Sequence, residues 1–200
     1  MELDHVLIAV SDLAAAAREF DAHHGLSSVE GGLHRDWGTA NRIVPLGSSY
    51  LELVAVVDPG VAAGSAFGRW VGDGATDAGR LIGWAVRTSG LDELAGRLGL
   101  TVRSGLRVTP SGEELRWRST GVDEAIAEPC LPFFIEWGEG VRLPGTENPR
   151  PASISRLVLE GSPDRLAAWL GDHSLPIRVL SGPAEVAAVV LSTSAGEIIL

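Results

Sequence analysis

Three glutamates stand at similar places within apolar, strand-like segments of the sequence. Glu52 lies in YLELV, Glu136 in FFIEW and Glu197 in GEIIL. Burying an unpaired carboxylate costs several kcal/mol or forces the group to stay neutral. A carboxylate repeated at one register therefore needs a shared reason, and a metal ion in a common cavity is one such reason. Glu197 is near the C-terminus, where solvation of a fraying end explains it as well.

Strand periodicity assigns a face to two of these carboxylates. Residues at every second position of a strand point to the same side of a sheet. We therefore expect Glu52 to share the cavity face with Tyr50, and Glu136 to share it with Phe134. The other residues of FFIEW would then pack against the helices.

Histidine and amide side chains add further candidates. His5 lies in the apolar segment LDHVLIAV, and His34, Trp37 and Asn41 crowd into the Gly-flanked stretch GLHRDWGTAN. Polar groups beside an aromatic ring are typical of the mouth of a ligand pocket, which makes His34, Trp37 and Asn41 candidate substrate-binding residues. A turn whose Asp and Asn satisfy backbone groups would explain the same stretch equally well.

The elements that must position these residues follow a repeated order. Residues 3–10 are apolar and β-branched, which predicts a strand, and LAAAAREFDAHH after Ser11-Asp12 predicts a capped helix that ends at Gly25. Three further strand-like segments follow, so the order is βαβββ. The same order returns near residues 81 and 154, which indicates an internal repeat.

The repeat divides the chain into modules and linkers. We predict a first βαβββ module over 1–57, a linker over 58–80, a second module over 81–139, a linker over 140–153 and a third, shorter module over 154–200, packed as one compact unit. The first linker is rich in Gly and Ala and predicts one short helix around Phe67 to Val71, and the second is rich in Pro. The fold class that follows is α+β, with βαβββ modules forming a cup-shaped mixed sheet and helices on its outer face.

Composition excludes several classes of function. The net charge of -10 disfavours nucleic acid as a partner. All 16 basic residues are Arg, so no lysine can form a Schiff base or serve a P-loop. Cys130 is the one cysteine, which fits a reducing compartment, and no signal peptide or membrane span is recognisable. We therefore expect a cytoplasmic protein without a membrane partner.

The opening LDHVLIAVSDLAAA, with Glu52 closing the first module, resembles the vicinal oxygen chelate superfamily. This superfamily includes glyoxalase I, the extradiol dioxygenases and antibiotic-sequestering proteins. The stretch GGLHRDWGTANRIVPLG followed by YLELVAV is more similar to its uncharacterised glyoxalase-like branch. The resemblance covers most of the chain, but only the first module carries clear motifs.

The resemblance implies a set of metal ligands. In the family, a first-strand His and a last-strand Glu of each paired module hold a divalent metal, and the substrate chelates it through two neighbouring oxygens. By this analogy His5, Glu52 and Glu136 are the metal ligands, and the ion would be Zn, Mn, Ni, Co or Fe. The fourth position falls on Gly83, which cannot bind metal. His34 could supply the missing imidazole from a neighbouring strand.

The function that this set implies is a glyoxalase-like, metal-dependent enzyme of the isomerase or lyase type. It would act on a small molecule with vicinal oxygens, and Glu52 or Glu136 would move a proton. A dioxygenase would need His34 as a further ligand and ranks lower. The alternative is a metal-free protein of the same fold that binds or sequesters a small molecule, which the missing ligand at Gly83 favours.

The third module leaves the architecture open, because a cup of this family needs two modules. It could cover an exposed sheet edge, or pair with its copy in a second chain to form a homodimer. If modules one and three formed the cup, Arg156 and Glu197 would replace Gly83 and Glu136 at the site.

Overall fold

The computed structural model describes residues 1–146 and 152–200, in which twelve strands and six α-helices are assigned. The strands are β1 (Glu2–Ala9), β2 (Val29–His34), β3 (Thr39–Pro45), β4 (Tyr50–Val56), β5 (Arg80–Arg87), β6 (Arg103–Val108), β7 (Glu114–Thr120), β8 (Phe133–Trp137), β9 (Ala152–Gly161), β10 (Ile177–Ser181), β11 (Glu185–Thr193) and β12 (Gly196–Ile199). The helices are α1 (Leu13–His24), α2 (Pro59–Gly64), α3 (Ala66–Gly74), α4 (Leu91–Leu98), α5 (Val122–Ala127) and α6 (Pro163–Leu170), with a 3₁₀ turn η1 at Arg35–Trp37. Part of the predicted linker 140–153 lies outside the described residues.

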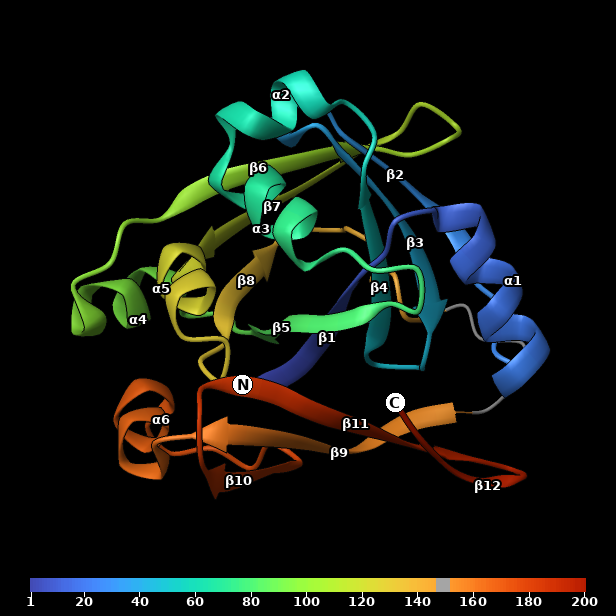
Figure 1. The fold of residues 1–200 in the computed structure, drawn as a ribbon. Helices are drawn as coiled ribbons and strands as arrows, with labels where there is room; N and C mark the ends of the chain where they lie inside the picture. The colour runs from blue at the N-terminus through green and yellow to red at the C-terminus, as the bar shows by residue number, and fades with distance from the viewer. Residues whose placement is uncertain (147–151) are drawn as a thin grey trace.

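Eight strands curl into a closed barrel in the order β1-β4-β3-β2-β6-β7-β8-β5 (Figure 1). β1 pairs in parallel with β4 and antiparallel with β5, so the first and second modules meet along the β1–β5 seam. The opposite seam, between β2 and β6, is joined through the pair of Leu33 and Val108. The two modules at the start of the chain therefore form the cup, and the predicted α+β fold class is confirmed.

The remaining strands form a separate four-stranded sheet in the order β10-β9-β11-β12. This sheet lies below the barrel in Figure 1, and its apolar side chains share one buried cluster with the outer side of β1 and β5. Leu157 and Val189 of the sheet and Trp84 of β5 belong to that cluster, and all three are fully buried. The third module thus packs against the outside of the barrel, and Arg156 and Glu197 are not among the residues that line its cavity.

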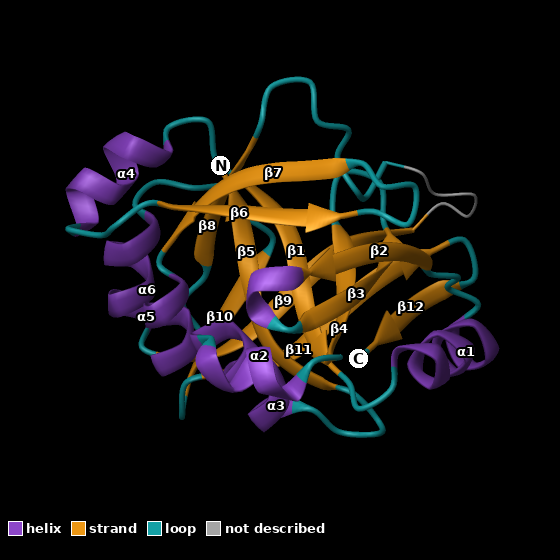
Figure 2. Cartoon of the chain, turned by 90° about the horizontal axis from the view of Figure 1, so that it is seen from above, coloured by secondary structure: helices purple, strands orange, loops and turns teal. Residues whose placement is uncertain are grey.

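The helices lie around the outside of the strands when the molecule is viewed from above (Figure 2). Helix α1 begins and ends at the predicted residues: Asp12 accepts a hydrogen bond from the Ala15 amide, and Gly25 ends the helix in the left-handed conformation. The first linker holds two helices where one was predicted, and α5 was not predicted. Phe67 and Trp70 of α3 pack into the apolar cluster inside the barrel, so this linker closes part of the cavity.

No helix among the described residues is long and apolar enough to cross a membrane.

Candidate functional site

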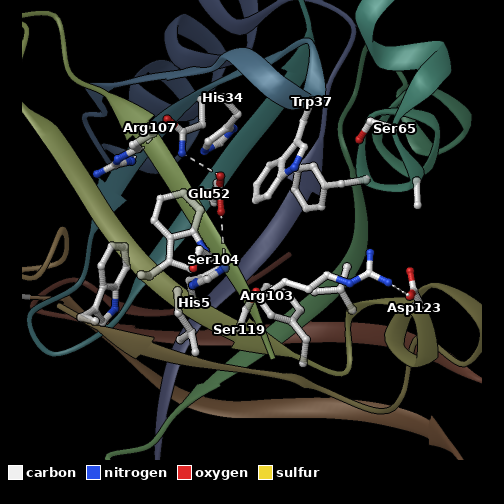
Figure 3. A pocket seen from close by; sticks show the side chains of 18 of the residues that line it. His5, His34, Trp37, Glu52, Ser65, Arg103, Ser104, Arg107, Ser119 and Asp123 are labelled. Carbon is white, nitrogen blue, oxygen red and sulfur yellow. Dashed lines mark hydrogen bonds and ion pairs between the residues drawn. The ribbon is translucent and has the colours of Figure 1, made fainter. Parts of the chain in front are cut away.

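The inside of the barrel holds a cavity of about 880 Å³, including the space at its open mouth. Side chains from both modules and from α3 line it, and Figure 3 shows how several of them point inward. The predicted residues His5, His34, Trp37, Asn41 and Glu52 all line this cavity.

His5 and Glu52 come together because β1 and β4 are neighbours in parallel register. Tyr50 lies opposite His5, and Glu52 lies one inward position further along β4. The His5 Nε2 and Glu52 Oε2 atoms are 3.4 Å apart, and both side chains are buried (Figure 3). Since an unprotonated imidazole nitrogen and a carboxylate repel each other at this distance, the contact is favourable when one of the two carries a proton.

Asp4 holds the other side of the His5 ring. Its Oδ1 atom is 2.7 Å from His5 Nδ1, and its Oδ2 atom accepts hydrogen bonds from Arg87 and Trp137 at 3.1 and 3.0 Å. Burial raises the pKa of Asp4, but the hydrogen bonds from His5 and Trp137 and the charges of His5 and Arg87 outweigh it, so the pKa lies below its usual value. An ionised Asp4 only accepts, which places a proton on His5 Nδ1 and turns His5 Nε2 toward Glu52.

Asn41 continues this polar chain on the far side of Glu52. Its Nδ2 atom donates to Glu52 Oε1 at 2.7 Å, and its Oδ1 atom accepts from Arg107 Nη1 at 3.3 Å. Asn41 and Arg107 are both about nine-tenths buried or more. A continuous series of contacts therefore crosses the cavity from Asp4 to Arg107.

His34 is held apart from this chain in an aromatic environment. Its Nδ1 atom is 3.0 Å from Thr39 Oγ1, and its ring contacts those of Trp37 and Trp117 at centroid distances of 5.2 and 6.0 Å. Burial lowers the pKa of His34 to about 4, so the ring is neutral at pH 7.

Aromatic rings form the rest of the wall. Trp37 lies 4.8 Å from Phe67 and 5.8 Å from Trp117 between ring centroids, and Trp117 lies 5.6 Å from Trp137. Such a surface suits a ligand with a flat apolar part.

Glu136 is not brought to this site. Its Oε2 atom accepts from Arg118 Nε at 3.0 Å on the outer side of β7 and β8, and Arg118 also bonds Asp92. The predicted orientation of FFIEW was wrong by one residue: Phe133 and Ile135 line the cavity, while Phe134 packs outward. The reason is the third module, because its α6 presents an apolar surface to that outer side of β8.

Phe134 illustrates the inversion. It is fully buried, and its ring centroid lies 6.0 Å from that of Trp169 on α6. A one-residue shift in a strand exchanges every side chain between the two faces. The carboxylate of Glu136 therefore faces away from the cavity.

The donor atoms present do not fit the expected metal centre. Two of the three predicted ligands, His5 and Glu52, face each other, and the second module offers Ala85, Phe133 and Ile135 at its inward positions. Gly83 serves packing instead, since a Cβ there would collide with the Trp70 ring. A metal site with open positions still needs about three protein ligands, and within residues 1–146 and 152–200 no group of three or more His, Cys, Asp or Glu side chains could hold an ion.

Two residues of the site were missed in the sequence. Asp4 precedes His5 directly, and an acidic residue beside a histidine in an apolar strand was the available signal. Arg107 lies in the alternating stretch GLRV, whose period would have placed it inward with Gly105. Tyr50, which was expected on the cavity face with Glu52, does line the cavity and stacks on the His5 ring at a centroid distance of 4.8 Å.

The comparisons with known proteins agree with this architecture. A family model described as a glyoxalase-like domain matches residues 3–174. Among curated proteins, none matches the chain. The chain has the vicinal oxygen chelate fold, with helices outside a curled eight-stranded sheet.

Solved structures resemble this chain at low sequence identity, and the first of them shows the same overall fold. A hypothetical protein from Staphylococcus aureus is 15% identical, with a TM-score of 0.74 over 96% of this chain and 91% of that chain. Methylmalonyl-CoA epimerase from Mycobacterium tuberculosis is 23% identical, with a TM-score of 0.46 over 68% of this chain and 85% of that one. A Streptomyces coelicolor methylmalonyl-CoA epimerase in complex with 2-nitronate-propionyl-CoA is 18% identical, with a TM-score of 0.49 over 70% and 97%.

Proposed function

The chain belongs to the glyoxalase-like domain family, and from this premise we propose that it is an enzyme of the isomerase or lyase type that moves a proton on a small, oxygen-bearing substrate. The observation that carries the proposal is the buried series Asp4–His5–Glu52, with Glu52 facing an aromatic-walled cavity. The substrate would bear adjacent oxygens, as in a hydroxy-carbonyl compound, because a carbonyl acidifies the neighbouring C–H bond.

Each residue of the series has a distinct part in this chemistry. Glu52 takes the proton from the carbon next to the carbonyl, since its buried carboxylate lines the cavity and is held by Asn41. His5 donates its Nε2–H to the Glu52 carboxylate and holds it in place, and Glu52 itself returns the proton to a carbon of the resulting enolate. Asp4 orients the imidazole and is a positioning residue, because it contacts His5 and not the cavity.

The proposal departs from the sequence-based expectation on the metal. His5 and Glu52 would be the protein ligands of any ion in this cavity, and two ligands fall short of what such sites use. The proton transfer proposed above therefore relies on the side chains alone.

A metal-free protein that sequesters a small molecule is the second candidate. The aromatic wall favours it, because stacked rings bind a flat ligand without any chemistry. The two candidates differ in whether a bound molecule exchanges its carbon-bound protons.

Solvent-deuterium exchange followed by proton NMR separates them. The wild type is incubated in D₂O with a panel of small 2-hydroxy- and 2-oxo-carbonyl compounds, both neutral and anionic. We expect exchange on at least one member, and Glu52→Gln to lower its rate about 10²- to 10⁴-fold. Glu136→Gln is the matched control, since its carboxylate lies outside the cavity and its loss should leave the rate unchanged.

Two results would contradict the proposed enzymatic function. Quenching of tryptophan fluorescence by a panel member that never exchanges would point to sequestration. Exchange that survives in Glu52→Gln would remove the carboxylate from its proposed part.

A further inference from the structure

Arg107 is a buried cation that has no acidic partner among residues 1–146 and 152–200. Its side chain lines the cavity from β6, and the residue is 5% exposed. Its polar contact is the 3.3 Å hydrogen bond to the amide oxygen of Asn41, and its Nε atom is buried with no hydrogen-bond partner in the part of the chain that the structure describes. Taking a guanidinium out of water without a counter-charge is strongly unfavourable. A guanidinium held in the wall of this cavity is therefore well placed to meet an anionic group of a ligand.

The neighbouring backbone is shaped to keep Arg107 in place. A Cβ atom at Gly31 would collide with the Asn41 side-chain oxygen and crowd Arg107 Nη1. Glycine at this position leaves room for the Asn41–Arg107 pair beside β2. The guanidinium is thus held by contacts on two neighbouring strands, and it is not a flexible surface side chain.

The other charged groups of the cavity do not neutralise Arg107. Arg103, at the mouth, is exposed and paired with Asp123 at 3.0 Å. Glu52 is bound by Asn41 and His5, and the Asn41 amide stands between it and Arg107. Burial keeps His34 neutral, with its pKa lowered to about 4. Arg107 is therefore the cation that a bound anion would meet.

We propose that Arg107 binds the carboxylate of the substrate, which makes the ligand a small carboxylic acid with a flat apolar or aromatic body. Arginine presents paired N–H groups that match the two oxygens of a carboxylate. The aromatic rings of Trp37, Phe67 and Trp117 line the same cavity and suit the apolar body. The proposal rests on the proposed function of this cavity and names its substrate class.

The position of Arg107 also fits the chemistry at Glu52. A single amide group, that of Asn41, separates the guanidinium from the Glu52 carboxylate. A carboxylate bound to Arg107 would hold the adjoining carbon atoms toward Glu52. The acid would then be oriented by its charge, with the exchangeable C–H bond next to the base.

Matched ligands test this without knowledge of the natural substrate. Phenylpyruvate and its methyl ester, and phenylacetate and phenylacetamide, form pairs of similar shape that differ in charge. Binding is measured by tryptophan fluorescence and by calorimetry. We expect each carboxylate to bind the wild type about tenfold or more tightly than its neutral partner.

Variants of Arg107 test whether this residue causes the tighter binding of carboxylates. Arg107→Met keeps the length and removes the charge, and it should abolish the preference. Arg107→Lys should keep part of it, because a lysine retains the charge but not the paired geometry. Gly31→Ala should weaken carboxylate binding while Arg107 stays charged. Arg116→Met, an exposed arginine on β7, is the matched control and should bind as the wild type does.

Thermal unfolding distinguishes a ligand-binding arginine from a structural one. Removing a buried, unpaired charge should raise the melting temperature of the free protein in Arg107→Met, whereas loss of a structural residue lowers it. A wild type that binds acids and their neutral partners equally would overturn the proposal, as would an unchanged preference in Arg107→Met.

The outcomes also separate this proposal from the proposed function. Deuterium exchange on neutral hydroxy-carbonyl compounds without any carboxylate preference would contradict the Arg107 proposal and leave the proton chemistry standing. An Arg107-dependent preference without exchange on any compound would support the carboxylate subsite in a sequestering protein.

Discussion

The first half of the barrel, β1 to β4, places His5 and Glu52 at the cavity, where they contact each other. The second half, β5 to β8, has the same order of strands but presents Ala85, Phe133 and Ile135 at its inward positions. The two halves thus share a topology and differ in chemistry. One supplies the contacting His5–Glu52 pair, and the other supplies a mainly apolar wall together with the Arg107 cation.

This difference shows how a repeated module can change function without changing fold. Strand pairing and outer packing preserve the barrel, because Trp84 and Phe134 of the second half are fully buried on its outer side. The inward positions are free of that constraint. The family resemblance implies a His and a Glu ligand from each module, and the inner wall of β5 to β8 carries neither.

The largest expected loss of activity comes from changing the half of the barrel formed by β1 to β4, which we call the polar half because it carries His5 and Glu52. His5→Gln removes the imidazole that contacts Glu52, and it should lower deuterium exchange about 10²- to 10⁴-fold. Ile135→Leu, at an inward position of the other half, should change the rate by no more than about threefold. Equal losses in the two variants, measured by NMR, would mean that the halves are not functionally distinct.

Asp4 joins the halves, so its loss should be the largest effect on stability. Asp4→Asn removes the buried partner of Arg87, which keeps its contact with the exposed Glu2, and weakens the hydrogen bonds from His5 and Trp137; this should cost about 2–3 kcal/mol. Chemical denaturation of Asp4→Asn beside the wild type measures this difference. A cost near zero would show that the seam does not depend on this ion pair.

His34 gives the polar half a pH dependence. Its folded pKa of about 4 is below the 6.5 of a free histidine, so the unfolded state binds more protons between these values. Stability is therefore complete above pH 6.5 and falls toward pH 4, by roughly 2–3 kcal/mol from this group. Asp4, whose pKa is lowered, loses its own contribution at still lower pH.

Urea unfolding at pH 7, 5.5 and 4.5 measures this slope. His34→Phe should flatten it, because phenylalanine has no proton to gain, and His23→Phe, an exposed histidine, should leave it unchanged. A slope that is the same in all three proteins would contradict the burial of a neutral His34.

The smallest effect is expected outside the cavity. Glu136→Gln breaks a partly exposed ion pair with Arg118, which should cost less than about 1 kcal/mol. Exchange activity should stay at the wild-type level. A large loss of activity with retained stability would place Glu136 in the chemistry after all.

Much of the fold was predictable because local signals agreed with it. Asp12 and Gly25 cap α1, Ser162 and Pro163 begin α6, and the alternation around Glu52 placed it inward. These features depend on residues close in sequence.

The site was less predictable because it depends on contacts distant in sequence. The face of β8 is decided by the third module, whose Trp169 packs on Phe134, and periodicity alone cannot choose between two apolar faces. Arg107 is hydrogen-bonded to Asn41, and Asp4 to Arg87, and in each pair the two residues lie on different strands. Sequence spacing carries no trace of those pairs.

The most direct test of the account is proton exchange in wild-type protein stripped of metal by a chelator. Metal content is counted by plasma mass spectrometry in the same samples. We predict that the stripped protein exchanges deuterium at the rate of the untreated protein, because Asp4, His5 and Glu52 carry out the transfer. Exchange that disappears on chelation and returns with one equivalent of a divalent metal would contradict this account.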